Sequence, residues 1–230
     1  MQLISPFHSP TNPIPWRAFT LLLGIVTAGV LNGCAFMQPH ADPTKFYVLT
    51  SPGGSAQPAP AREAVRWKIG LRPIEMPAYL QTKLMVVRTG ASEIQFAEFD
   101  RWAEPLDAGI SRVMKETLGS APNVESVALN SRGDDTLNYE IKMRVQACEG
   151  VRGAGGNGSI SLAMSWEIRS LGTDSTLVQC GGFTARAAVW DGSDYGQLAM
   201  RLSEAIAHAG LACAADLPKA TVFDGNQPRK

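Results

Sequence analysis

The residues from Leu137 to Ala147 read LNYEIKMRVQA, and those from Ile160 to Ile168 read ISLAMSWEI. In both stretches apolar side chains alternate with polar or small ones, the period of two that gives a strand one buried and one solvated face. A third strand is expected from about Thr176 to Val189. Such half-buried strands are typical of antiparallel sheets, so this half of the chain predicts a three-stranded meander.

Two amphipathic helices flank the meander. The first follows Pro105, which suits the first turn of a helix, and it ends near Gly119 and Pro122. Its apolar stripe consists of Leu106, Ile110, Val113, Met114, Thr117 and Leu118. The second runs from Tyr195 to Cys213, with Ser193 as a possible N-cap, and Pro218 stops it. Both stripes have helical spacing, and simple core packing accounts for them.

The N-terminal half predicts further strands over residues 45–50 and 65–71, a hairpin of 84–88 with 93–99, and a weak strand over 124–129. The order of elements predicts a single α+β domain over residues 45–217. We expect a mostly antiparallel mixed sheet with two amphipathic helices packed on it. Residues 218–230 are expected to form a disordered tail.

The first 33 residues contain no acidic side chain and one basic one, Arg17. The apolar run from Ala18 to Val30 follows, shorter than the ~20 residues that cross a bilayer. A positive charge, a short apolar core and then small residues form the layout of a secretory signal peptide. Residues 1–33 are therefore predicted to be removed from the mature protein.

This leader ends in Leu31-Asn-Gly-Cys34, which resembles a bacterial lipobox. The resemblance implies that Cys34 becomes the first mature residue and carries diacylglycerol and an N-acyl chain such as palmitate. Ala35 replaces the aspartate that commonly retains lipoproteins at the inner membrane, which favours the periplasmic face of the outer membrane. Residues 34–44 lack periodicity and are predicted to be a lipidated tether, whose ten residues after Cys34 reach at most ~33 to 36 Å.

Composition argues against several classes of function. The 21 basic and 21 acidic residues give a net charge of +0, which disfavours nucleic-acid binding. Gly153 to Gly158 fits G-x-G-x-x-G, but strands precede and follow it, so it predicts a hairpin loop and not a dinucleotide site. The chain contains three histidines, and His208 lies on a predicted helix without a second histidine to share a metal. We therefore expect no catalytic residue, metal or cofactor apart from the covalent lipid. A hydrolase is disfavoured because the sequence shows no nucleophile paired with a base.

Three cysteines remain after Cys34, namely Cys148, Cys180 and Cys213. An exported protein can keep disulfides, and a bridge between Cys213 of the last helix and Cys180 of a strand is possible. Three small thiols without a bridge are at least as consistent with the sequence.

A set of short motifs occurs in a fixed order along the mature chain. The set consists of the lipobox, Phe46-Tyr-Val-Leu49, Pro77-Ala-Tyr-Leu80, Trp102-Ala-Glu-Pro-Leu106, Asp135-Thr-Leu-Asn138 and Asp191-Gly-Ser-Asp-Tyr195. Together they resemble the ABC-type transport auxiliary lipoproteins, the family of PqiC and YmbA. The three cysteines of the mature domain and the glycine-rich hairpin depart from the family pattern.

The resemblance implies a non-enzymatic docking subunit at the outer membrane. Its partner would be the tunnel protein of an intermembrane lipid transport system built from MCE (mammalian cell entry) domains, which supports envelope integrity. Candidate interface residues are Pro77, Tyr79, Leu80, Trp102 and Pro105, because Pro77 limits backbone pairing and leaves a loop for a partner. Tyr79 and Leu80 as core residues, and Trp102 as a staple on the first helix, are equally consistent with the sequence.

Two further questions stay open at the level of sequence. A direct periplasmic lipid carrier, with an acyl chain between sheet and helices, is the alternative function. Association with further copies of the chain is also possible, and neither the cargo nor the driving force of transport follows from the residues.

Overall fold

The computed structural model describes residues 41–51, 66–130, 136–153, 157–171, 176–185 and 189–218. The chain divides into two units, Met1–Pro43 and Thr44–Lys230, and every element below belongs to the second. The predicted signal peptide, Cys34 and most of the predicted tail lie outside the described residues.

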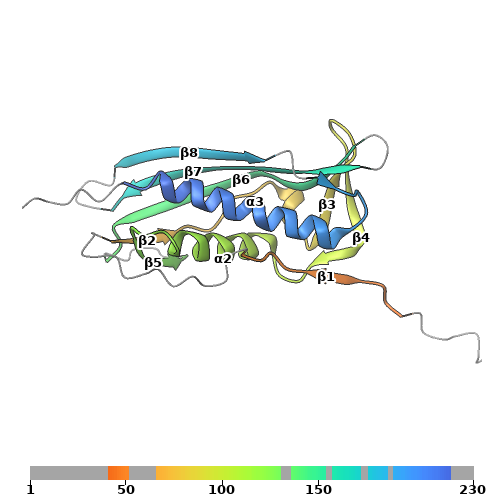
Figure 1. Cartoon of the computed structure of the whole chain (residues 1–230), viewed down its shortest axis with the longest axis horizontal. Coiled ribbons are helices and arrows are strands. Elements are labelled where there is room, and N and C mark those ends of the chain that lie inside the picture. Colours follow the sequence, from red (N-terminus) through yellow and green to blue (C-terminus); the bar gives the residue numbers. More distant parts are fainter. Residues whose placement is uncertain are drawn as a thin grey trace, which may run out of the picture. The chain divides into compact units, whose positions relative to one another are not determined.

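A mixed β-sheet is the framework of the second unit (Figure 1). Its centre is the long strand β6 (Tyr139–Arg152), which pairs antiparallel with β7 (Gly158–Ser170) along almost its whole length. Strand β7 also pairs antiparallel with β8 (Leu177–Ala185) and with the short β9 (Val189–Trp190). The predicted meander is confirmed, although its third strand is divided into β8 and β9.

The other edge of β6 is parallel. Its beginning pairs with β2 (Trp67–Leu71) and its end with β3 (Leu84–Arg88). Beyond these strands, β5 (Val124–Leu129) pairs parallel with β2, and β4 (Ile94–Trp102) forms the predicted hairpin with β3. The outermost strand, β1 (Lys45–Tyr47), pairs parallel with β4.

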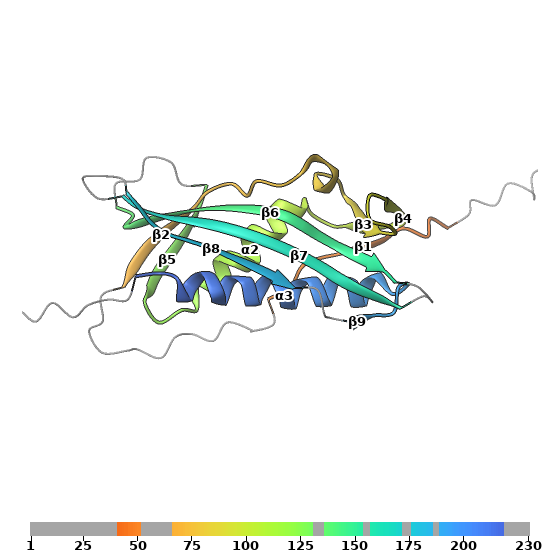
Figure 2. The same cartoon turned by 90° about the horizontal axis from the view of Figure 1, so that it is seen from above.

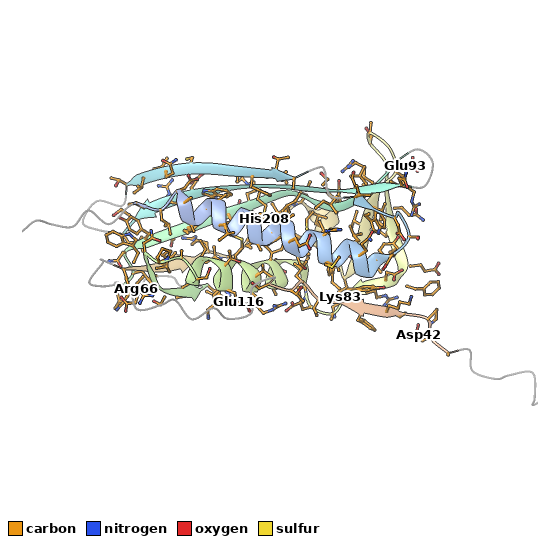
Figure 3. All side chains as sticks on the ribbon, viewed as in Figure 1. Asp42, Arg66, Lys83, Glu93, Glu116 and His208 are labelled. Carbon is orange, nitrogen blue, oxygen red and sulfur yellow. The ribbon has the colours of Figure 1, made fainter. Side chains whose placement is uncertain are left out.

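Two helices cover one face of the sheet, α2 (Leu106–Gly119) and α3 (Tyr195–Ala215) (Figure 2). Every residue of the predicted α2 stripe is buried, and so are Leu198, Leu202, Ile206, Ala209 and Cys213 of the α3 stripe. His208 is exposed on α3, as expected for a helix histidine outside the core (Figure 3). The α+β architecture with two helices on a mixed sheet is thus confirmed.

The N-cap of α3 is Asp194, so the prediction of Ser193 was wrong. The Asp194 side chain accepts hydrogen bonds from the backbone N–H groups of Gly196 and Gln197. Ser193 instead donates its own N–H to the Asp191 carboxylate, which also accepts the N–H of Asp194 at 2.6 Å. These backbone hydrogen bonds lower the pKa of Asp191. The turn before the helix is therefore organised by two aspartates, and a serine has no capping role there.

The glycine-rich stretch joins β6 to β7 as a hairpin, as predicted, with Arg152 opposite Gly158. Gly158 has an additional role that the sequence did not indicate. A Cβ at this position would lie 2.6 Å from Cε3 of Trp190, whose ring is completely buried. The Trp190 indole N–H donates to the backbone oxygen of Asp194 at 2.6 Å, just before α3. The absence of a side chain at Gly158 therefore lets Trp190 pack where the last helix begins.

Candidate partner-docking site

The segment between β2 and β3 makes one last backbone contact with the sheet at Glu75. Glu75 still forms a bridge with β6, donating its N–H to Met143 O at 3.1 Å and accepting from Val145 N at 2.8 Å. Its carboxylate lies 2.9 Å from both Lys142 Nζ and a guanidinium nitrogen of Arg144, and these hydrogen bonds lower its pKa. Because the bridge is a single residue long, the chain separates from the sheet immediately after it.

Pro77 then begins a single 3-10 turn, η2 (Ala78–Leu80). Proline has no N–H, so it cannot extend the bridge to β6, and its carbonyl accepts the N–H of Leu80 at 3.0 Å. Leu80 is 1% exposed and belongs to the hydrophobic core, whereas Pro77 and Tyr79 are half-buried. The turn thus has one residue anchored in the core and two at the surface.

Tyr79 lies over an ion pair of the sheet. The Arg88 side chain of β3 contacts Glu149 of β6, with 2.6 Å between Nε and Oε1, and Glu149 is 1% exposed. The Tyr79 hydroxyl makes a long hydrogen bond of 3.5 Å to the backbone oxygen of Gln146. Burial, together with the Glu149 charge, raises the pKa of Tyr79 to about 12. Tyr79 is therefore a neutral hydrogen-bond donor that attaches η2 to β6.

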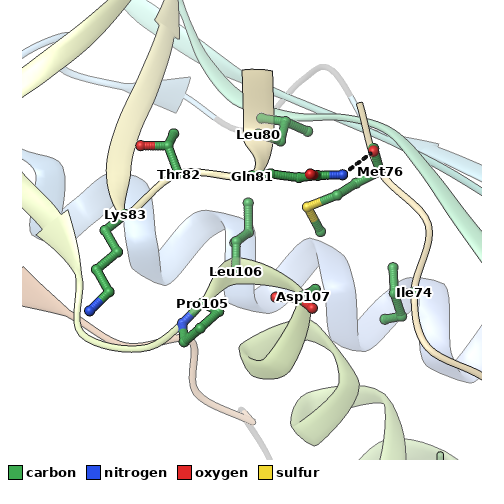
Figure 4. Close-up of a pocket in the computed structure, with 9 residues that line it drawn as sticks. All are labelled: Ile74, Met76, Leu80, Gln81, Thr82, Lys83, Pro105, Leu106 and Asp107. Carbon is green, nitrogen blue, oxygen red and sulfur yellow. Dashed lines mark hydrogen bonds between the residues drawn. The ribbon is translucent and has the colours of Figure 1, made fainter. Parts of the chain in front are cut away.

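A cleft of 380 Å³ opens between this segment and the start of α2 (Figure 4). Its wall on the segment side includes Met76, Leu80 and Gln81, and the Gln81 amide donates to Met76 O at 3.1 Å. The remaining lining residues are Ile74, Thr82, Lys83, Pro105, Leu106 and Asp107. Apolar walls with a few polar groups, including one lysine and one aspartate, are typical of binding sites.

The structure brings two of the five predicted interface residues into the same cleft. Leu80 and Pro105 both line it, although they are separated by two strands in the sequence. Pro105 is exposed, and Pro77 and Tyr79 lie on the outer side of the same segment. Trp102 is 4% exposed and packs in the core. Leu80 therefore lines the cleft from the core side and Trp102 lies outside its lining, and neither side chain offers much surface to a partner.

Several cleft residues were missed at the level of sequence. Met76, Gln81, Lys83 and Asp107 belong to no motif, and only their positions beside the Pro77 turn and the start of α2 relate them to the predicted set. In the sequence, these residues could have been found only by their closeness to Pro77 and Pro105, where regular structure is interrupted.

The described residues carry little reactive chemistry. None of their His, Cys, Asp and Glu side chains forms a group of three suited to a metal. Cys148, Cys180 and Cys213 are all free, so the possible bridge from the last helix to the sheet is not formed. None of the helices in the described ranges is long and apolar enough to cross a membrane.

The profile of the family described as "ABC-type transport auxiliary lipoprotein component" matches residues 47–214. The chain belongs to this family. The predicted resemblance is thereby confirmed at the level of the family, and with it a lipoprotein class associated with transport. No curated protein sequence matches the chain significantly.

Solved structures show the same fold. A crystal structure of a Xanthomonas campestris protein of the DUF330 family matches with a TM-score of 0.60 at 15% identity, and the match covers 74% of this chain and 92% of that one. Another, of an uncharacterized protein, has a TM-score of 0.58 at 19% identity, with 76% and 99% covered. A PelC dodecamer from Paraburkholderia phytofirmans is more distant, with a TM-score of 0.40 at 15% identity and 64% and 86% covered. That likeness is too low to argue about the assembly of this chain.

Proposed function

We propose that this chain is a non-catalytic docking subunit of an MCE-type intermembrane lipid transport system. The lipid on Cys34 holds it at the periplasmic face of the outer membrane, and it supports envelope integrity by holding the outer end of the tunnel protein near the leaflet. The family description, an auxiliary lipoprotein of ABC-type transport, supports the general role. The MCE-domain partner and the location at the outer membrane are proposed here in addition to that general role.

The observation that carries the docking role is the cleft between the Pro77 segment and α2. It combines apolar walls with a lysine and an aspartate at positions fixed by backbone structure. Such a surface suits recognition of a protein segment.

The anchoring role follows from the lipobox at Cys34. One acyl chain binds a membrane weakly, whereas two or more hold a protein stably. We expect the wild-type chain to stay in the membrane pellet after a salt wash and the Cys34→Ala variant to leave it. A Cys34→Ala protein that remains in the pellet would overturn this part of the proposal.

Site-specific photo-crosslinking in cells tests the docking role. A photoreactive residue replaces Tyr79 or Pro105, and mass spectrometry identifies what is captured. Matched controls are Tyr139, which is also a half-buried tyrosine, and Pro122, an exposed proline beyond the other end of α2. We expect an MCE-domain protein to be captured from Pro105 in the cleft and from Tyr79 on the outer side of the same segment, and much less from the controls.

The same experiment contains the outcomes that contradict the proposal. Equal capture from the two test positions and the two control positions would mean that the cleft and its segment are not the interface. Capture of further copies of the chain alone would favour a self-assembled ring as the role of this surface.

The lipid-carrier alternative requires space for an acyl chain between sheet and helices. The apolar faces of α2 and α3 pack on each other and on the sheet, so their burial is accounted for by the core itself. A carrier would be favoured if one lipid molecule per chain copurified with the Cys34→Ala variant, which has no covalent lipid of its own.

A further inference from the structure

Exposed apolar side chains gather at the edge of the sheet where the tether enters the domain. On β1 and directly after it, Phe46 is 61% exposed and Val48 is 49% exposed. On the neighbouring β4, Phe96 and Phe99 are each 43% exposed. Within the described ranges, every exposed phenylalanine lies on one of these two strands. We call Phe46, Val48 and Phe99 the entry-edge patch.

The strand register makes Phe46 of β1 and Phe99 of β4 neighbours. Strand β1 runs parallel to β4, with Lys45 opposite Asp100 and Phe46 opposite Arg101. Because alternate residues of a strand share a face, Phe99, two residues before Arg101, lies on the same face as Phe46 and one step along the strand from it. Because β1 has no strand on its other side in the described sheet, the patch lies at an open edge (Figure 1).

Phe46 and Val48 are not needed to attach β1 to the hydrophobic core. The same short stretch places Leu49 in the core at 2% exposure, and Tyr47 donates a hydrogen bond to Asp100 at 2.9 Å. Strand β1 is thus fixed by its inward side chains, while Phe46 and Val48 remain outside. Contiguous apolar side chains that stay in water usually mark a surface for a protein or a membrane.

We infer that the entry-edge patch lies against the bilayer leaflet that holds the Cys34 lipid. This inference rests on the proposed lipidation of Cys34. Ten residues, 35–44, separate that cysteine from β1, which limits the distance between leaflet and strand to at most ~33 to 36 Å. Such a short connection gives the patch a high effective concentration at the membrane, so even a weak contact is populated.

The charges around the patch indicate which lipid surface it suits. Lys45 and Arg101 on its rim are balanced by Glu98 and Asp100. A polybasic cluster would favour anionic lipids, and none is present among these rim residues. The patch therefore suits zwitterionic phospholipid, with phenylalanine rings at the boundary between headgroups and acyl chains.

The test uses the full-length chain in cells, with a benzoylphenylalanine at Phe46 or at Phe99. The control position is Leu177, which is 50% exposed on β8 at the opposite edge of the sheet. After illumination, intact-mass spectrometry of the purified protein separates phospholipid adducts from protein adducts. We expect phospholipid adducts from Phe46 and Phe99 at roughly fivefold or more the yield from Leu177, because only the tethered edge is held at the leaflet.

The outcomes distinguish the patch from the anchor. Equal lipid yields at all three positions, or protein adducts in place of lipid at Phe46 and Phe99, would overturn the inference even if the protein stays in the membrane pellet. Loss of the wild-type chain from the pellet in a salt wash would instead overturn the anchoring proposal on which the inference rests.

Discussion

Replacing Gly158 with alanine should destabilise the domain through one contact that can be named. The new Cβ would lie 2.6 Å from Cε3 of Trp190 and 3.1 Å from the carbonyl oxygen of Val151. The carbon–carbon distance is roughly 0.9 Å shorter than the optimal separation of about 3.5 Å. Trp190 is completely buried and its indole N–H is bonded to Asp194 O, so the ring has no free direction in which to move.

Overpacking of a well-packed core costs about 1 to 3 kcal/mol, and the rigid partner places Gly158→Ala in the upper part of that range. A loss of about 2 to 3 kcal/mol corresponds to a fall in melting temperature of about 4 to 12 °C for a domain of this size. Urea unfolding followed by circular dichroism measures the free energy of unfolding directly. The matched control is Gly119→Ala at the end of α2, where a Cβ would meet nothing within 4 Å.

A double-mutant cycle identifies the cause. Trp190→Phe removes the outer six-membered part of the indole, which carries Cε3, at its own cost in packing and hydrogen bonding. In that background Gly158→Ala should cost less by about 1 kcal/mol or more, as expected for residues in contact. The reasoning is refuted if Gly158→Ala is as stable as Gly119→Ala, or if its cost is the same with and without Trp190.

Three further predictions concern single groups. Cys180 is exposed and should react with iodoacetamide in the native protein. Burial raises the pKa of Cys148 to about 12 and should protect its thiol until the chain unfolds. Mass spectrometry of timed samples measures both labelling rates, and equal rates would contradict the prediction. Arg88→Met should lower the free energy of unfolding, measured in urea, by about 3 kcal/mol, because it leaves Glu149 buried without a cation. Glu149→Gln should lower it by less, because the Arg88 side chain is 31% exposed and can turn to water. Equal losses for the two variants would contradict this reasoning. The fold raises the pKa of Tyr79 to about 12, from about 10 in an unfolded chain, so the folded state favours the neutral phenol. The resulting stabilisation is complete below pH 10 and is lost as the pH rises towards 12. Tyr79→Phe should therefore reduce the fall of the urea midpoint over this pH range, and a fall as steep as in the wild type would contradict this explanation.

The sequence predicted the elements whose periodicity is local. The α2 stripe from Leu106 to Leu118 is buried as its spacing required, and the alternation in β6 and β7 gives the observed antiparallel pairing. Local periodicity reports which face of an element is apolar. It therefore identified the helices and the meander without information from distant residues.

The parallel half of the sheet could not be derived in the same way. Strand β2 alternates in sequence, yet Ile69, Gly70 and Leu71 are all buried, because β5 and β6 pair on its two sides. Its neighbours are about 55 and 70 residues away in the chain, and no local pattern specifies such partners. The same limit applies to the cleft, which forms because the Pro77 turn and the start of α2 meet through tertiary packing.

Candidate interface residues could be selected from sequence, but their accessibility could not. Trp102 and Leu80 are large and apolar, and a sequence pattern cannot distinguish an exposed anchor from a core residue of the same type. Only the burial of both, beside the exposed Pro105, shows which members of the set a partner can reach.

Trp102 nevertheless connects the two surfaces to which we assign roles. Its N–H donates to Lys83 O in the cleft wall at 2.7 Å, and its register partner on the edge strand is Tyr47. The next residue, Ala103, donates its N–H to Tyr47 O at 2.8 Å. The tethered edge and the docking cleft are therefore joined by backbone hydrogen bonds through one position of β4. If the entry-edge patch lies on the leaflet, these bonds fix the height of the cleft above it, so a bound tunnel end is held at a distance set by the fold and not by the full reach of the tether.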